Sequence, residues 1–298
     1  MTTDKPVKSM PDVSRDKDNL DFRTHWERRI WLASKRLKQH LRPFRGEKTC
    51  VLIPGMQRSG SKLLVHLLEW SRHTDCYPEN DRRAFDYFQM RNTDKILELI
   101  AASPAEFFVI KSLCESDHTH MLLRKFAPAK AVWILRDFRD CVNSCIRNFN
   151  GFAMRTHRIV EDRALAGWRG RGMSDQTWRL LKKLDKPDMN EATGAALQWY
   201  YRNIFYFEQN LEVDPRVMLV KYEDMVTEPL STVSGIFDFV GIPGMSPWIV
   251  RQIHARSLRK NATPPIDREV YELCIGLQDR FASVSGSQHG HDRSTLGH

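Results

Sequence analysis

A glycine-punctuated loop between a short apolar run and a helix start is the feature that most constrains the fold of this chain. The segment from Val51 to Leu64, VLIPGMQRSGSKLL, reads as a strand, a loop and a helix that begins near Ser61. That order gathers backbone N–H groups and a helix N-terminus around one point, which is how proteins bind phosphate. Gly55 and Gly60 let the backbone curl tightly around an anion. The segment therefore predicts a phosphate-binding loop in an α/β protein.

The loop departs from the P-loop pattern of NTPases at one position. In the pattern G-x-x-x-x-G-K-[ST], lysine directly follows the second glycine, whereas here Ser61 follows it and Lys62 comes next. Arg58 and Ser59 supply further hydrogen-bond donors before that glycine. The sequence therefore predicts a phosphate cradle that differs from an ordinary NTPase loop.

A second segment carries the same kind of signal. Residues 130–135, KAVWIL, read as a buried strand, and the helix start RDFRDCVNS follows at once. Arg136 stands at the carboxyl end of this strand, where ligands bind in open α/β sheets. Ser144 comes eight residues later, a little over two helical turns, so both side chains can face one ligand group. A guanidinium and a hydroxyl together suit a second phosphate.

Three segments in this order resemble the sulfotransferase family. PGMQRSGSKLL resembles its 5′-phosphosulfate loop, WILRDFRDCVNS its 3′-phosphate element, and residues 217–243 its later strand–Tyr-Glu-Asp–helix segment. The resemblance covers most of residues 46–260. It implies a P-loop-like three-layer α/β fold with a central parallel sheet flanked by helices. It also implies the donor 3′-phosphoadenosine 5′-phosphosulfate (PAPS; product PAP), which carries phosphate at both ends of the ribose.

The resemblance also implies catalytic residues. Arg58 and Lys111, which follows an apolar strand, serve the transferred group. The spacing from Arg58 to Glu79 matches the arginine–glutamate spacing of tyrosylprotein sulfotransferases and related Golgi-type enzymes, in which the glutamate deprotonates the acceptor. The cytosolic small-molecule enzymes use a histidine instead, so His118 and His120 are competing candidates for the base.

Donor-binding residues follow from the same resemblance. They are Arg58, Ser59, Gly60, Ser61, Lys62, Arg136, Ser144, Tyr222 and Ser257. Lys62 is a departure, because most relatives have threonine at the last two loop positions. Tyr222 is expected either against the nucleotide or in the core. The R-K-G-x-x-G segment of cytosolic members is missing, and the basic stretch from Ser257 to Lys260 stands nearest to its place, which points to the Golgi-type branch.

Composition fits a globular enzyme. The 298 residues are 41% hydrophobic and 28% charged, which suits one large α/β domain. No apolar window is long enough to span a membrane, and no secretory signal is visible. Six cysteines without a framework spacing predict free thiols in a reducing compartment, hence a cytoplasmic protein. The net charge of +9 predicts either a solvated basic surface or a polyanionic acceptor, and we expect no nucleic-acid partner because no such motif appears.

The predicted organisation has three parts. Residues 1–45 form a disordered leader and a basic amphipathic helix, residues 46–282 form the sulfotransferase-like domain, and residues 283–298 form a flexible tail. The helix, Thr24–Leu41, has Trp26, Ile30, Leu37 and Leu41 at helical spacing. It packs either on its own domain or on an anionic membrane surface, as a peripheral contact.

Strands and helices alternate through the predicted domain. The predicted strands lie near 49–54, 106–111, 130–135 and 216–220, and the predicted helices near 61–72, 83–101, 116–127, 138–149 and 191–210. This alternation favours a parallel sheet covered on both faces. Residues 151–190 break it and are expected to form a helical insertion, with one helix from Ser174 to Leu184. The insertion is either an acceptor-side wall or a structural excursion. An aromatic stripe in the 191–210 helix is expected in the core.

These observations predict a PAPS-dependent sulfotransferase that acts by in-line displacement on a hydroxyl or amine. The acceptor class stays open among small molecules, glycans, lipids and peptides, and the sequence gives no oligomeric state. One alternative is a P-loop kinase or phosphotransferase that uses ATP, although the chain shows no aspartate placed after a strand to hold magnesium, so no metal is expected. A non-catalytic anion-binding module is the other alternative.

Overall fold

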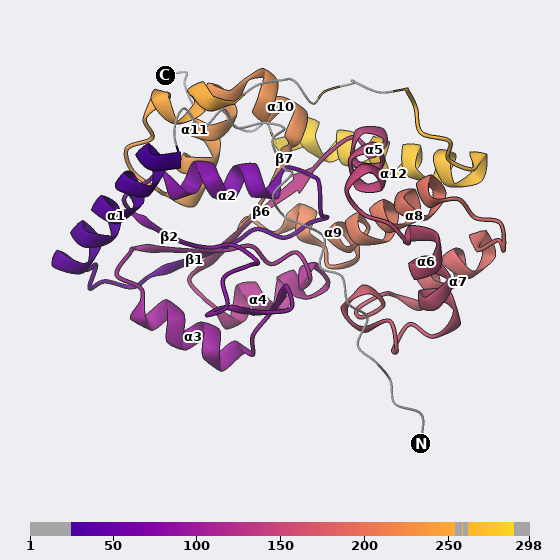
Figure 1. Ribbon diagram of the computed structural model, residues 1–298, viewed down its shortest axis with the longest axis horizontal. Coiled ribbons are helices and arrows are strands. Elements are labelled where there is room, and N and C mark those ends of the chain that lie inside the picture. The colour runs from indigo at the N-terminus through magenta and orange to yellow at the C-terminus, as the bar shows by residue number, and fades with distance from the viewer. Residues whose placement is uncertain (1–24, 254–257, 259–261, 289–298) are drawn as a thin grey trace.

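The computed structural model describes residues 25–253, 258 and 262–288, and it is built around one five-stranded parallel sheet (Figure 1). The strand order is β2–β5–β1–β6–β7. The strands are β1 (Thr49–Leu52), β2 (Thr74–Tyr77), β5 (Phe107–Ile110), β6 (Ala129–Leu135) and β7 (Val217–Lys221). After β1 the chain builds the β5–β2 side of the sheet, and then the β6–β7 side. The strand order therefore reverses at β1, which is where open α/β sheets bind ligands.

Helices cover both faces of the sheet, as the sequence predicts. The helices on one face are α2 (Ser61–Glu69), α10 (Tyr222–Thr227) and α11 (Pro229–Val240). Those on the other face are α3 (Thr93–Ala102), α4 (Thr119–Lys125), α5 (Phe138–Asn148) and α8 (Glu191–Asn203). Side chains along each strand alternate between the two faces: in β1, Cys50 and Leu52 join one buried cluster, while Val51 joins the other. Burial on both faces explains why the strands read as continuous apolar runs.

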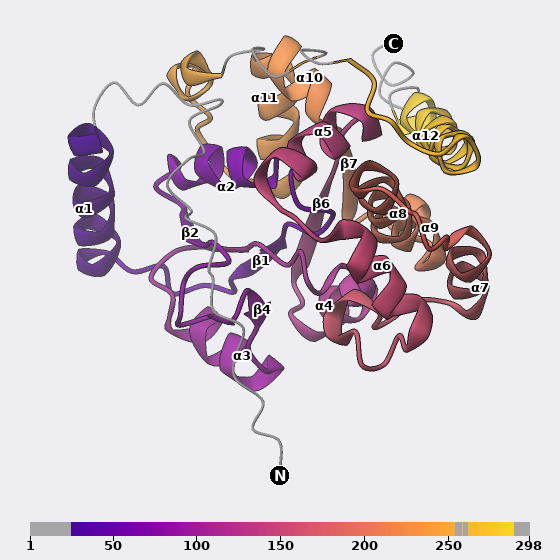
Figure 2. The same ribbon diagram turned by 45° about the vertical axis from the view of Figure 1, so that its right-hand side comes forward.

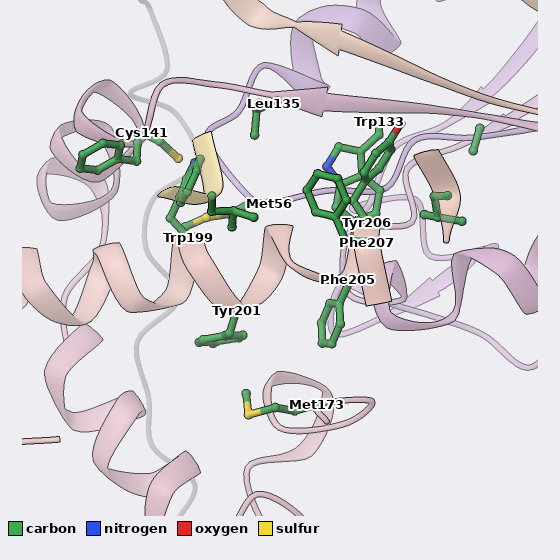
Figure 3. Close-up of a cluster of buried hydrophobic side chains, with 14 of the residues drawn as sticks. Met56, Trp133, Leu135, Cys141, Met173, Trp199, Tyr201, Phe205, Tyr206 and Phe207 are labelled. Carbon is green, nitrogen blue, oxygen red and sulfur yellow. The ribbon is translucent and has the colours of Figure 1, made fainter. Parts of the chain in front are cut away.

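The aromatic stripe of the 191–210 segment lies in the core, as predicted (Figure 3). The segment forms α8 and, after a break at Ile204, the short α9 (Phe205–Glu208). Trp199 packs at one end of the cluster beside Met56 and Cys141, which belong to the β1–α2 loop and to α5. The core is therefore continuous with the backbone of the phosphate-binding loop.

The predicted insertion is helical. It contains α6 (Phe152–Glu161), the short 3₁₀ helix η3 (Gly167–Arg169) and α7 (Asp175–Leu184). Ser174 caps α7 by accepting a hydrogen bond from the Thr177 N–H, so the predicted start of this helix is confirmed. In both ribbon views α6 and α7 lie on the side of the molecule opposite the N-terminal helix α1 (Figures 1 and 2).

One predicted helix is wrong over half its length. Residues 83–91 contain the two-stranded hairpin β3 (Phe85–Asp86) and β4 (Gln89–Met90), and α3 begins only at Thr93. The turn between the strands places Tyr87 and Phe88 at positive φ, 45° and 67°. Such backbone angles are uncommon for bulky residues, so no propensity rule predicts this turn. Strand β2 was not predicted either, because it has four residues and two of them, Thr74 and Asp75, are polar.

Helix α1 (His25–Leu41) packs through a face that the hydrophobic pattern did not indicate. Lys35 is buried, and its ammonium donates to the Glu69 carbonyl at 2.7 Å and to Thr74 Oγ1 at 3.0 Å. Three of the predicted apolar positions, Ile30, Leu37 and Leu41, are exposed instead. The side chain of Trp26 and the leader 1–24 lie outside the described residues. Contact of this helix with a membrane stays a prediction.

The C-terminal region differs from the expected tail. Helix α12 (Arg268–Gln288) packs against α8 and continues through residues 283–288, where the sequence pattern predicted a flexible segment. Few apolar residues stand at the end of this helix, which explains why the pattern missed it. The rest of the expected tail lies outside the described residues. None of the described helices is both long and apolar enough to span a bilayer.

Candidate functional site

The predicted site residues line up along the carboxyl edge of the sheet. In spatial order, Glu79 follows β2, Lys111 follows β5, the phosphate-binding loop 53–60 follows β1, Arg136 follows β6, and Tyr222 follows β7. Residues far apart in sequence meet at this edge because all five strands run in the same direction. The edge thus has a β2–β5 half and a β6–β7 half, with the loop between them.

The backbone of the loop has the form of an anion cradle. Gly55, Arg58 and Gly60 have φ angles of 121°, 69° and 102°. Left-handed residues inside such a loop turn successive N–H groups toward one concave side. Helix α2 then begins at Ser61 with no acidic residue in its first turn, so nothing there opposes a bound anion. A Cβ at Gly60 would lie 2.3 Å from Tyr222 Cδ2, and only glycine fits this close approach.

Two contacts that the sequence did not reveal fix this loop. The Gly55 N–H donates to the buried Ser116 hydroxyl at 2.8 Å. At the other end, the Cys141 thiol, buried in α5, donates to the Gln57 carbonyl at 3.5 Å. A serine and a cysteine far along the chain carry no motif by themselves, so only the fold identifies their role.

Arg58 joins the loop to the second phosphate element. Its Nε donates to Ser144 Oγ at 2.9 Å, and its carbonyl accepts from Arg136 Nη1 at 3.1 Å. Arg136 and Ser144, eight residues apart in sequence, therefore lie at one place, where the helical spacing predicted them. The Trp199 indole N–H donates to the Arg136 carbonyl at 3.0 Å and positions that backbone from the core.

Other donor-binding candidates differ in exposure. Ser59 and Ser61 are buried, whereas Lys62 is exposed on α2. Tyr222 is almost fully buried, and the Arg136 guanidinium stacks 4.6 Å from the centroid of its ring. Of the two placements expected for Tyr222, the structure has the core one, beneath the loop. Ser257 lies outside the described residues.

Glu79 and Lys111 meet on the β2–β5 half. Glu79 Oε2 lies 3.0 Å from Lys111 Nζ, and the two side chains are 30% and 9% exposed. The lysine is thus held inside the edge, while the carboxylate retains access to solvent. The two histidines have other neighbours: His118 Nε2 lies 3.3 Å from Asp117 Oδ2, and His120 is exposed at the start of α4.

A second carboxyl group on this half was not predicted. Glu115 is buried, and its Oε1 accepts from the Met90 N–H at 2.9 Å. Burial raises the pKa of Glu115 above its ordinary value. The contact fixes the β3–β4 hairpin beside the segment that follows β5. Within residues 25–253, 258 and 262–288, no three His, Cys, Asp or Glu residues gather as metal ligands would.

The insertion is attached to the same half of the edge. Arg171 Nε donates to Asp117 Oδ2 at 2.9 Å, and its Nη2 donates to the Cys114 carbonyl at 3.1 Å. Asp117 and Cys114 belong to the segment that begins with Lys111. Through these Arg171 contacts, the insertion is attached on the Glu79–Lys111 side of the site. A wall of the acceptor site is expected on that side.

The chain matches one protein-family model and is similar to several solved structures. The family model of the sulfotransferase domain matches residues 48–265. Among solved structures, the chain is similar to a sulfotransferase from Alicyclobacillus acidocaldarius (14% identity, 83% of this chain and 96% of that one, TM-score 0.46). It is also similar to a Mycobacterium avium sulfotransferase (14%, 87% and 82%, 0.44) and to a mouse sulfotransferase complexed with PAP (17%, 79% and 73%, 0.39).

A search of curated proteins found no match. The family model, in contrast, covers more than two thirds of the chain, including every strand of the five-stranded sheet and the site residues from Arg58 to Ser257. The protein belongs to the sulfotransferase domain family.

Proposed function

We propose that the protein transfers a sulfuryl group from PAPS to a hydroxyl or amine acceptor by in-line displacement. One observation carries this proposal: two phosphate-binding elements on the neighbouring strands β1 and β6 meet at Arg58. A donor with a 5′-phosphosulfate and a 3′-phosphate needs two such elements, whereas an ordinary nucleoside triphosphate needs one continuous cradle.

The residues present fit this donor. Ser59, Gly60, Ser61 and Lys62 would hold the phosphosulfate at the α2 N-terminus, and Arg136 with Ser144 would hold the 3′-phosphate, with Arg58 between the two groups. Ser257 stays a proposed donor contact, and Tyr222 supports the loop from beneath through Gly60. When bound, PAPS supplies an activated sulfuryl group.

On the acceptor side, the ion pair defines the proposed chemistry. Lys111 and Arg58 would stabilise the negative charge that develops on the bridging oxygens. Glu79 would take the proton of the acceptor hydroxyl or amine, and its ion pair with Lys111 holds the carboxylate at the edge of the sheet. Of the three candidate bases, Glu79 is the one in contact with Lys111, which favours the Golgi-type arrangement over the histidine-based one.

The compartment is part of the same proposal. All six cysteines of the chain are free in the structure, and five of them are buried. Free thiols in this number suit a reducing compartment, so we place the protein in the cytoplasm. The acceptor itself is not defined by these residues beyond its hydroxyl or amine group.

Calorimetric titration with PAP, AMP and ATP–Mg²⁺ tests the proposal. We expect PAP to bind and AMP to bind far more weakly, because AMP lacks the 3′-phosphate that Arg136 and Ser144 would hold. ATP–Mg²⁺ is expected to bind no better than AMP. Equal affinities for PAP and AMP contradict the two-phosphate reading, and tight binding of ATP–Mg²⁺ favours a kinase.

A further inference from the structure

The insertion contains a pocket that the donor site does not use. Helix α6 and η3 enclose about 610 Å³, lined by Arg155, Arg158 and Arg169, by the acids Glu161 and Asp162, and by three apolar side chains. This volume lies within the range of small-molecule sites, so the pocket has room for a ring or a charged substituent. In Figure 2, α6 lies on the side of the molecule opposite α1.

Two of the pocket arginines, Arg155 and Arg169, form no ion pair with any residue that the structure describes. The Arg155 guanidinium stacks on Phe152, 4.2 Å from the ring centroid, and Arg169 stacks on Trp168 at 4.5 Å. Arg155 Nε is buried with no hydrogen-bond acceptor, and neither arginine forms an ion pair within the described part of the chain. Burial, and then the charge of Arg169, lower the pKa of Arg155. Two guanidinium groups that line the same pocket would be stabilised by an anion bound between them.

The acids of the pocket limit the size of that anion. Asp162 is occupied within its own turn, where Oδ1 accepts from the N–H groups of Ala164 and Leu165 at 2.8 and 3.1 Å. Glu161 is exposed at the end of α6. Their negative charge would repel a long polyanion, whereas a single anionic group can still contact Arg155 and Arg169.

The η3 side of the pocket is packed against the segment that follows β5. Arg169 stacks on Trp168, the Arg202 guanidinium lies 5.2 Å from the centroid of the same ring, and Arg202 donates to the Leu113 carbonyl, two residues after Lys111. The Arg171–Asp117 ion pair fixes the η3 segment to the same stretch of chain. The pocket therefore stands next to the stretch of chain that carries Lys111, the partner of Glu79.

We infer that the Arg155–Arg169 pocket binds one anionic group, a carboxylate, phosphate or sulfate, carried by the acceptor. The inference rests on the proposed function, because it assumes that the acceptor reacts beside Glu79. It makes the acceptor a molecule with a nucleophilic hydroxyl or amine and a separate negative charge. The insertion then selects the acceptor by that charge.

Binding of matched aryl probes to the PAP-saturated protein tests the inference. The probes are 4-nitrophenyl β-D-glucuronide and 4-nitrophenyl phosphate, which are anionic, and 4-nitrophenyl β-D-glucoside, which is neutral. We expect the anionic probes to bind at least about 10-fold more tightly than the glucoside, since charge-assisted contacts supply that difference. Arg155→Gln and Arg169→Gln should each remove most of this preference, and Arg155→Lys should restore part of it.

Arg179→Gln is the control, because Arg179 is an exposed arginine of the same insertion that does not line the pocket; it should keep the full preference. Affinity for PAP is measured first for every variant and should stay unchanged. Equal affinity for the three probes, or no binding of any of them, overturns the inference. A preference for the anionic probes that survives both glutamine variants overturns it as well. Failure of the wild-type protein to bind PAP counts instead against the proposed function.

Discussion

The two halves of the sheet edge are built differently. On the β6–β7 half, Arg136, Ser144 and Tyr222 are buried and linked to the loop through Arg58 and Gly60. On the β2–β5 half, Glu79 is 30% exposed and pairs with Lys111, and Arg171 of the insertion contacts the segment that follows β5. A donor that never changes suits a rigid, buried site, whereas the acceptor side is free to vary with its substrate. We therefore expect substitutions on the two halves to have separable effects.

The largest effect is expected from Glu79→Gln. Loss of a general base lowers kcat about 100- to 10,000-fold, while affinity for PAP should stay the same because Glu79 lies on the acceptor half. Steady-state kinetics and PAP titration measure the two quantities. His118→Ala and His120→Ala are the paired controls and should keep most of the activity. If a histidine variant is inactive while Glu79→Gln keeps its activity, that histidine, and not Glu79, is the general base.

Arg136→Ala should have a smaller effect, and on the opposite half. A charge-assisted contact contributes about 1.5–3 kcal/mol, so affinity for PAP should fall about 10- to 100-fold while affinity for AMP barely changes. Arg147→Ala removes an exposed arginine of α5, the helix that carries Ser144; it is the matched control and should leave both affinities unchanged. If Arg136→Ala weakens AMP as much as PAP, Arg136 does not read the 3′-phosphate.

Gly60→Ala tests the loop that lies between the two halves of the edge, and it should lower the free energy of unfolding modestly. Alanine in the left-handed conformation costs about 1–2 kcal/mol. Gly241→Ala isolates that cost, because Gly241 has a φ of 90° but open space around its Cβ position. At Gly60 the new methyl group must also displace Tyr222, so its free energy of unfolding should fall further than that of Gly241→Ala. Equal losses of unfolding free energy in the two variants, measured by urea denaturation, would show that the loop has room for the new methyl group beside Tyr222.

The same division explains what the sequence could predict. The loop after β1 and the start of the β6–β7 half are encoded in contiguous segments, a strand followed directly by its glycine loop or by Arg136, and these segments place their own residues. The β2–β5 half depends on β2, which stands at the end of the strand order beside β5, and on a hairpin whose turn has two bulky residues at positive φ. Neither β2 nor this hairpin has a local sequence pattern that predicts it.

The most informative residues that sequence reasoning missed act through tertiary contacts. Ser116 and Trp199 bond to backbone groups of Gly55 and Arg136, which lie far from them along the chain. The arginines of the insertion were visible as basic composition, but only the fold brings Arg155 and Arg169 into one pocket. Sequence reasoning missed these residues because their partners lie far from them along the chain, and not because their chemistry is weak.

The central claim is tested most directly by following the transferred group. The protein is incubated in EDTA with PAPS labelled in its sulfur, together with a panel of hydroxyl and amine acceptors that carry or lack a negative charge. In parallel it is incubated with Mg²⁺ and ATP labelled in its γ-phosphate. We predict labelled sulfur on an acceptor in EDTA, strongly reduced by Glu79→Gln, and no transfer of labelled phosphate. Phosphate transfer, or sulfur transfer that requires Mg²⁺, would contradict the account.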